Sequence, residues 1–161
     1  MIKSIRSRKD RLCYLYTTLK DEADRSDSLQ IQNILAGHFV LSAGGHLEDS
    51  LKEIIIEYTK IKSDPKVQRF LEIAVKNLNS LSCGKIGNFL TKFDVDLWEK
   101  VKDRCTSSDL SSVDSLKSVR DKIAHGQQGS IGILAVKGYF DGICNVVQAI
   151  SDEMLGEGFS T

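Results

Sequence analysis

The chain has 161 residues, of which 41% are hydrophobic and 27% are charged. This length allows one domain with a substantial core, so we expect a single domain over residues 1–161 that folds without disulfides or a structural metal. Lys plus Arg equals Asp plus Glu at 22 each. The balance excludes the strong long-range field with which a very basic protein attracts nucleic acid or acidic membranes.

The four cysteines are widely spaced and form no C-x-x-C pair, which predicts free thiols in a reducing compartment. The basic N-terminus is not followed by an apolar segment of the kind found in signal peptides. The longest weakly polar run, residues 34–47, is too short to span a bilayer. We therefore expect a cytoplasmic protein without a membrane segment.

Apolar residues recur at three- and four-residue spacing in almost every long segment, and Pro65 is the only proline, which together predict an all-α protein. The first helix is expected over about residues 5–23. A long second helix is expected over about residues 29–61, with Ser28 as its N-terminal cap. Gly44 and Gly45 lie inside the second helix. Because glycine is unfavourable there, the pair predicts either a bend or another backbone packed closely against it, in a helix-helix contact or at a dimer interface.

Asp64 and Pro65 are typical of the start of a helix, and we expect a third helix from there to about Leu81. The stretch 83–105 predicts two short helices, and residues 106–109 predict a loop.

Two further amphipathic helices are expected in the last third of the chain. The first has apolar residues at positions 113, 116, 119 and 123 and is ended by Gly126. The second runs from about Val136 to Met154 and has the most regular apolar stripe in the sequence, so it should form a main wall of the bundle.

Polar residues with chemical potential gather at the end of the helix before Gly126. Asp121 and His125 are four residues apart, so the carboxylate can hydrogen-bond the imidazole, orient it and raise its pKa. Lys117 lies one turn earlier on the same face. Arg120 is about 140° from His125 around an ideal helix, so the two converge only if the helix unwinds or a symmetric partner adds a second copy. The alternative is a solvated Lys117–Asp121 ion pair and a histidine that stabilises the helix end.

Residues 120–126 read Arg-Asp-Lys-Ile-Ala-His-Gly and resemble the HEPN superfamily signature, in which a histidine follows an arginine after four to six residues. Residues 41–51, a run of small residues followed by Glu48, resemble the RiboL-PSP-HEPN branch, as does the closing helix. The resemblance covers about residues 29–155. It implies an all-α bundle of about five to seven helices that dimerises by placing the two signatures face to face in one cleft.

In active members of the superfamily this cleft cleaves RNA without a metal. The resemblance implies a homodimeric endoribonuclease, similar to toxins or anti-phage effectors, with Arg120 on the scissile phosphate, His125 as acid and base, and Asp121 orienting the imidazole. These residue types suit the reaction, because histidine titrates near neutral pH and arginine offers a planar fork to phosphate oxygens.

Three further residues belong to the expected site. Lys117 and Lys122 are the candidates for binding flanking RNA phosphates, and Glu48 is expected near the cleft as a supporting residue. The expected partners are RNA, a second copy of the chain and an antitoxin or sensor protein.

No metal or other cofactor is expected. His38 and His46 are eight residues apart with no Cys, Asp or Glu that completes a zinc spacing, and no glycine-rich phosphate loop follows a strand. Two alternatives to the nuclease stay open: a catalytically inactive HEPN module that binds a partner protein, a nucleotide or RNA, and a helical adaptor with an accidental motif. The neutral overall charge does not separate them, although an RNA enzyme usually needs a basic surface.

Overall fold

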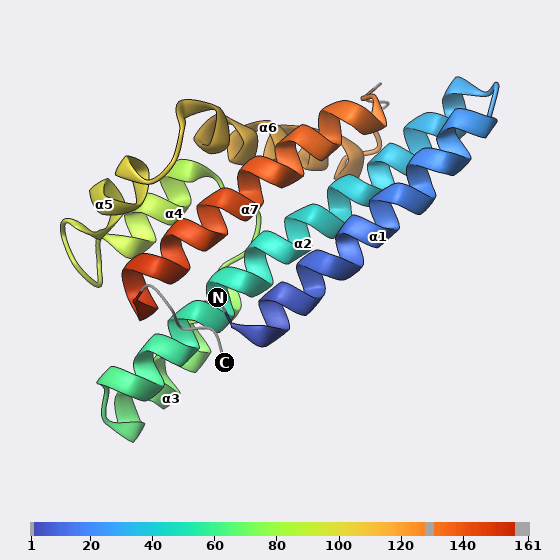
Figure 1. Cartoon of the computed structure of the whole chain (residues 1–161). Helices are drawn as coiled ribbons and strands as arrows, with labels where there is room; N and C mark the ends of the chain where they lie inside the picture. The colour runs from blue at the N-terminus through green and yellow to red at the C-terminus, as the bar shows by residue number, and fades with distance from the viewer. Residues whose placement is uncertain (1, 128–130, 157–161) are drawn as a thin grey trace.

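The first two helices, α1 (Lys3–Arg25) and α2 (Leu29–Lys62), lie side by side as a long antiparallel pair (Figure 1). The computed structural model describes residues 2–127 and 131–156. α2 begins after Ser28, whose hydroxyl accepts a hydrogen bond from the backbone N–H of Ile31 at 3.4 Å, as its sequence position predicts. α2 then continues without interruption through Gly44 and Gly45.

Two later helices complete the main bundle. α7 (Ile133–Leu155) runs along α2, and α6 (Ser107–Ala124) packs on both of them (Figure 1). Gly142 of α7 permits the close approach of α6, because a Cβ at this position would lie 2.6 Å from the Oγ of Ser112. The expected all-α bundle of five to seven helices is confirmed: the described part of the chain forms seven α-helices and one short 3₁₀ helix.

The expected third helix is shorter than its sequence suggested. α3 (Pro65–Ala74) begins at Pro65 with Asp64 as its cap, as predicted, but it ends at Ala74 and is followed by the 3₁₀ helix η1 (Val75–Asn77). The prediction of a helix to Leu81 was wrong. The chain leaves the helix so that Leu78 and Leu81 can enter the core, where they are 5% and 3% exposed.

The two short helices predicted within residues 83–105 are confirmed as α4 (Cys83–Leu90) and α5 (Leu97–Asp103). The loop predicted at residues 106–109 is wrong, because α6 begins at Ser107. Thr106 accepts a hydrogen bond from the N–H of Asp109 at 3.1 Å, and the Asp109 carboxylate accepts one from the N–H of Thr106 at 2.9 Å. This capping box is a helix-start signal that the sequence does contain.

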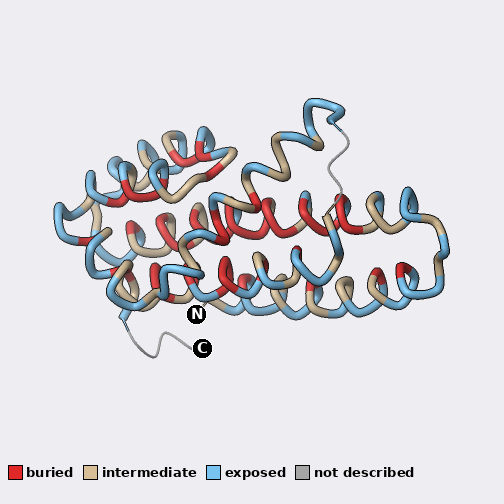
Figure 2. Tube along the Cα trace, turned by 90° about the horizontal axis from the view of Figure 1, so that it is seen from above, coloured by how far each residue is buried: buried red, intermediate tan, exposed pale blue. Residues whose placement is uncertain are grey.

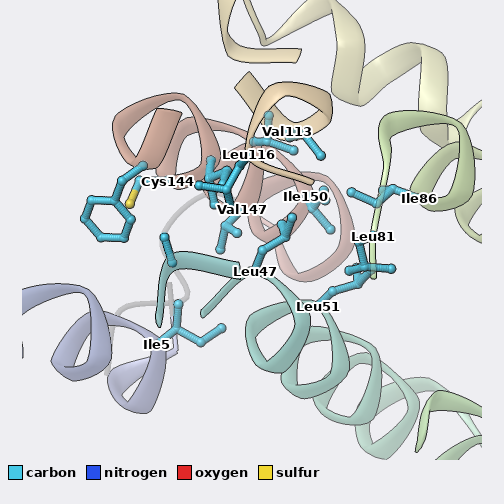
Figure 3. Packing of buried hydrophobic residues seen from close by; sticks show 14 of the residues in the cluster. Ile5, Leu47, Leu51, Leu81, Ile86, Val113, Leu116, Cys144, Val147 and Ile150 are labelled. Carbon is cyan, nitrogen blue, oxygen red and sulfur yellow. The ribbon is translucent and has the colours of Figure 1, made fainter. Parts of the chain in front are cut away.

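One apolar core joins the helices. The buried residues follow the facing sides of α2, α6 and α7, while the outer sides of the helices are exposed (Figure 2). Figure 3 shows side chains from five helices meeting in this core, with Ile5 from α1, Leu47 from α2, Ile86 from α4, Leu116 from α6 and Val147 from α7. Burial of this apolar surface is the main source of stability for such a bundle.

By length and composition, α7 could cross a membrane, and it is the one helix of the described residues of which this is true. It is longer than the run at residues 34–47 that the sequence singled out. Half of its apolar stretch is buried inside the bundle, and Phe140, Ile143 and Ile150 are fully buried. Its composition is therefore that of a core helix and does not indicate a membrane protein.

Candidate functional site

The end of α6 has a defined geometry that places His125 at the surface. The helix stops at Ala124, and Gly126 adopts a left-handed conformation with φ +69°. The N–H of Gly126 donates to the carbonyl of Ile123 at 3.0 Å, and the N–H of Gln127 donates to the carbonyl of Lys122 at 2.9 Å. These two bonds form a Schellman motif, so the predicted helix end at Gly126 is confirmed.

His125 is the C-terminal cap of α6 and its side chain is exposed. An exposed imidazole at a helix C-terminus is accessible to a ligand. This position suits a proton donor or acceptor.

Arg120 points in another direction, towards α2. Its guanidinium donates a hydrogen bond to the carboxylate of Glu48 and forms an ion pair with it. The aliphatic part of the side chain crosses α2 at Gly44, where an added Cβ would lie 3.1 Å from the Cδ of Arg120. The group in close contact with Gly44 is therefore the arginine side chain and not the backbone of another element, and an added Cβ at Gly45 would meet nothing within 4 Å.

Glu48 joins three segments of the chain. The side chain is only 10% exposed, and its Oε1 atom accepts hydrogen bonds both from Arg120 and from the backbone N–H of Ser80. Ser80 lies between η1 and α4 with a positive φ of 50°, so the turn that follows α3 is tied to α2 and α6. Glu48 thus contacts the arginine of the segment 120–126.

Asp121 accepts its hydrogen bonds from Lys117 and from the hydroxyl of Ser80, the latter at 3.3 Å. The hydrogen bond from Lys117 lowers the pKa of Asp121 most, and the bond from Ser80 and the charge of His125 lower it further. The carboxylate is therefore ionised at neutral pH. The hydrogen bond expected between Asp121 and His125 is not formed, because the oppositely charged Lys117 one turn earlier is the stronger partner for the carboxylate.

The structure brings most of the predicted site residues together. Arg120, Glu48, Asp121 and Lys117 form one polar cluster with Ser80 at the junction of α2, α6 and the turn before α4. His125 lies close enough to affect the pKa of Asp121. Lys122 is exposed in the last turn of α6 and is separate from the cluster.

Ser80 was not predicted from the sequence. It lies in a short loop 41 residues before Asp121, and no spacing or motif links it to α6. Only its positive φ, which is uncommon for a residue other than glycine, marks it as a position under constraint.

No group of three or more His, Cys, Asp or Glu side chains within the described ranges could hold a metal ion. His46 is 1% exposed and packs against the ring of Phe140 at a centroid distance of 5.8 Å, so it is a core residue. His38 is exposed on α2.

An all-α bundle in which one helix carries an inward arginine and ends in an exposed His-Gly pair defines a HEPN-type protein. The model of the RiboL-PSP-HEPN family matches residues 4–156, and the chain belongs to this family. No curated protein and no solved structure shows a significant match to the chain.

Proposed function

We propose that this protein is a metal-independent endoribonuclease whose reaction centre is built from Arg120 and His125. The observation that carries the proposal is the arrangement at the end of α6, where the guanidinium of Arg120 is held in place by Glu48 and the imidazole of His125, five residues further on, is exposed. A fixed cation and an accessible proton-transfer group are what phosphodiester cleavage without a metal requires.

The proposed reaction is an internal transesterification. The ribose 2′-hydroxyl loses its proton to a neutral imidazole and its oxygen forms a bond to the adjacent phosphorus. The bond from phosphorus to the 5′-oxygen breaks, and an imidazolium donates a proton to that oxygen. The products are a 2′,3′-cyclic phosphate and a 5′-hydroxyl, with no oxidant, reductant or metal consumed. Arg120 stabilises the charge that develops on the phosphate oxygens.

The two imidazoles come from two subunits in this proposal. A homodimer that places the ends of its α6 helices face to face supplies His125 twice, once as the base and once as the acid, with Asp121 supporting the imidazole electrostatically. Lys117 and Lys122 hold the flanking phosphates. Lys122 is the more accessible of the two, because Lys117 is engaged by Asp121.

We further propose that the enzyme acts in the cytoplasm as a toxin or as an anti-phage defence effector. An antitoxin or sensor protein would then control its activity, since unrestrained cleavage of cellular RNA harms the cell that makes it. The family membership supports this assignment at the level of the HEPN module.

A second candidate is a catalytically inactive HEPN module that binds RNA, a nucleotide or a partner protein. The observation that favours it is the ion pair between Arg120 and Glu48. The pair neutralises part of the positive charge that a transition state would need.

The test is incubation of the purified protein with mixed cellular RNA in EDTA, beside Arg120→Ala and His125→Ala. Arg25→Ala is the matched control, because Arg25 is an exposed arginine on α1 that pairs only locally with Glu22. We expect cleavage by the wild type and by Arg25→Ala and a loss of at least about a hundredfold in the other two variants, the usual scale of general acid–base catalysis.

The ends of the products separate the mechanisms. Fragments with 2′,3′-cyclic phosphate and 5′-hydroxyl ends support the proposal, whereas 3′-hydroxyl ends refute it. If several RNA classes stay intact, the binding module replaces the nuclease. Mixing the wild type with increasing amounts of His125→Ala tests the dimer. Because the proposed cleft needs His125 from both subunits, a mixed dimer should be inactive, and cleavage should fall more steeply than the share of wild-type subunits.

A further inference from the structure

A groove of about 750 Å³ lies between the first half of α2 and the end of α6. Figure 1 shows that the end of α6 lies over this half of α2. The α2 wall is a stripe at helical spacing that includes Gln30, Asn33, Ile34 and His38. The volume of the groove falls within the range of small-molecule sites in proteins, roughly 300–1,000 Å³.

The groove borders the segment that carries the exposed His125. Its second wall consists of Ile123, Gly126 and Gln127, the last two of which follow directly after His125 in the chain. A ligand bound in the groove would therefore lie beside the backbone of the segment that carries the imidazole.

The lining has a particular chemistry. Its polar members are the amides of Gln30, Asn33 and Gln127 and the imidazole of His38, and its apolar members include Ile34 and Ile123. The described lining contains no Lys, Arg, Asp or Glu. Such a surface offers hydrogen-bond donors and acceptors between apolar walls, without a charge to attract a phosphate or an ionised side chain.

We propose that this groove binds an unpaired RNA base next to the scissile phosphate and sets the sequence preference of cleavage, an inference that rests on the proposed nuclease function. A nucleobase is neutral and planar, with apolar faces and an edge of donors and acceptors. Unpaired RNA bases are typically recognised by stacking on aromatic or histidine rings and by hydrogen bonds to their edges.

Three residues have separate roles in this site. The exposed ring of His38 is the stacking surface, and the amide of Asn33, five residues earlier on α2 and also in the lining, pairs with a base edge. Gly37 keeps the floor of the groove low, since a Cβ there would already touch the Cδ1 of Ile123 at 3.5 Å. A larger side chain at Gly37 would fill the groove.

The first experiment measures binding without any cleavage. The four ribonucleosides are titrated separately into the intact protein and followed by NMR at the backbone amides of Gly37, Gly126 and Gln127. We expect one or two nucleosides to shift these signals. Asn33→Leu, which keeps the size but removes the amide, should weaken that binding about three- to tenfold, the value of one net hydrogen bond.

Further variants separate stacking from bulk. His38→Ala should weaken binding and His38→Phe should restore it, because the phenyl ring keeps the stacking surface. Gly37→Leu should abolish binding. Its matched control is Gly45→Leu in the same helix, where an added Cβ meets nothing within 4 Å. If Gly37→Leu fails to fold, the Asn33 and His38 variants still decide the question.

A second experiment examines the cleavage sites of wild type and Asn33→Leu in the same RNA. A changed base preference at the cleavage sites of Asn33→Leu supports the inference. An unchanged preference, or nucleoside binding insensitive to Asn33 and His38, overturns it while leaving the nuclease intact.

If Ile34→Glu instead converts a dimer to a monomer, the groove is a subunit interface and the inference fails. Base binding by a protein that cleaves no RNA supports the base site but removes the nuclease.

Discussion

The guanidinium of Arg120 on α6 donates a hydrogen bond to the carboxylate of Glu48 on α2, 72 residues earlier in the chain. Glu48 accepts a second hydrogen bond from the backbone of Ser80. Both hydrogen-bond donors to Glu48 thus come from other segments of the chain. The orientation of the Arg120 side chain therefore depends on the packing of the bundle as well as on α6.

Glu48→Gln should lower the free energy of unfolding by about 1–3 kcal/mol, because it leaves a largely buried arginine without its charged partner. Urea unfolding measures the change. Glu57→Gln is the control, since Glu57 lies on the same helix but pairs only with the exposed Lys60. Equal losses in the two variants would show that the Glu48 contact has no special weight.

The glycine pair of α2 offers a matched comparison. Gly45→Ala should stabilise the protein by about 0.5–1 kcal/mol, because alanine is the better helix former and its Cβ meets nothing within 4 Å. Gly44→Ala should gain none of this, since its Cβ would lie 3.1 Å from the Cδ of Arg120, whose far end is held by Glu48.

Thermal or urea unfolding of both alanine variants, together with RNA cleavage, checks this comparison. We expect cleavage to fall in Gly44→Ala alone, because the arginine must shift. An equal gain in stability at the two positions, with activity retained in both, would contradict the proposed role of Gly44 as the place where Arg120 crosses α2.

Gly126 is expected to be sensitive through its backbone alone. Its φ of +69° is unfavourable for a side chain, and an added Cβ would meet nothing within 4 Å. Gly126→Ala should therefore lower the free energy of unfolding by about 1 kcal/mol, while Gly126→Asn should cost less, because asparagine tolerates this conformation. Urea unfolding measures the change in both variants. Equal losses of stability in Gly126→Ala and Gly126→Asn would contradict the explanation from the backbone conformation.

The stability of the protein should depend on pH through His46. The pKa of His46 is lowered from its usual 6.5 to about 4, mainly by burial and also by the nearby charges of Arg8 and Lys9, while the charge of Glu53 opposes the shift. Between pH 6.5 and about 4 the unfolded chain binds a proton at His46 that the folded protein does not bind. Stability should therefore fall as the pH falls through this window, by up to about 3 kcal/mol.

Urea unfolding at a series of pH values between 7 and 4 measures this dependence. In His46→Gln the part of the slope that comes from the imidazole should disappear, whatever the overall stability of the variant. The same slope in both proteins would assign the pH dependence to other groups.

Much of the fold follows from interactions that act over a few residues. The apolar stripe of residues 136–154 predicted α7, Ser28 and Asp64 predicted helix starts, and Gly126 predicted the end of α6. The two errors differ in kind, because the first concerns a local capping signal and the second concerns packing in the core. The Thr106–Asp109 capping box was overlooked, and the helix expected to reach Leu81 ends at Ala74 because Leu78 and Leu81 enter the core.

The candidate site is different in kind. The four-residue spacing placed Asp121 and His125 on one face of a helix, and the small residues before Glu48 indicated a close contact. Neither pattern predicted which side chains Asp121 and Glu48 contact in the structure. Periodicity and capping operate between neighbours in the chain, so they can be read along it. The meeting of Arg120 with Glu48 and of Asp121 with Ser80 depends on how three helices and a turn pack against each other, and that packing is set by the complete apolar core.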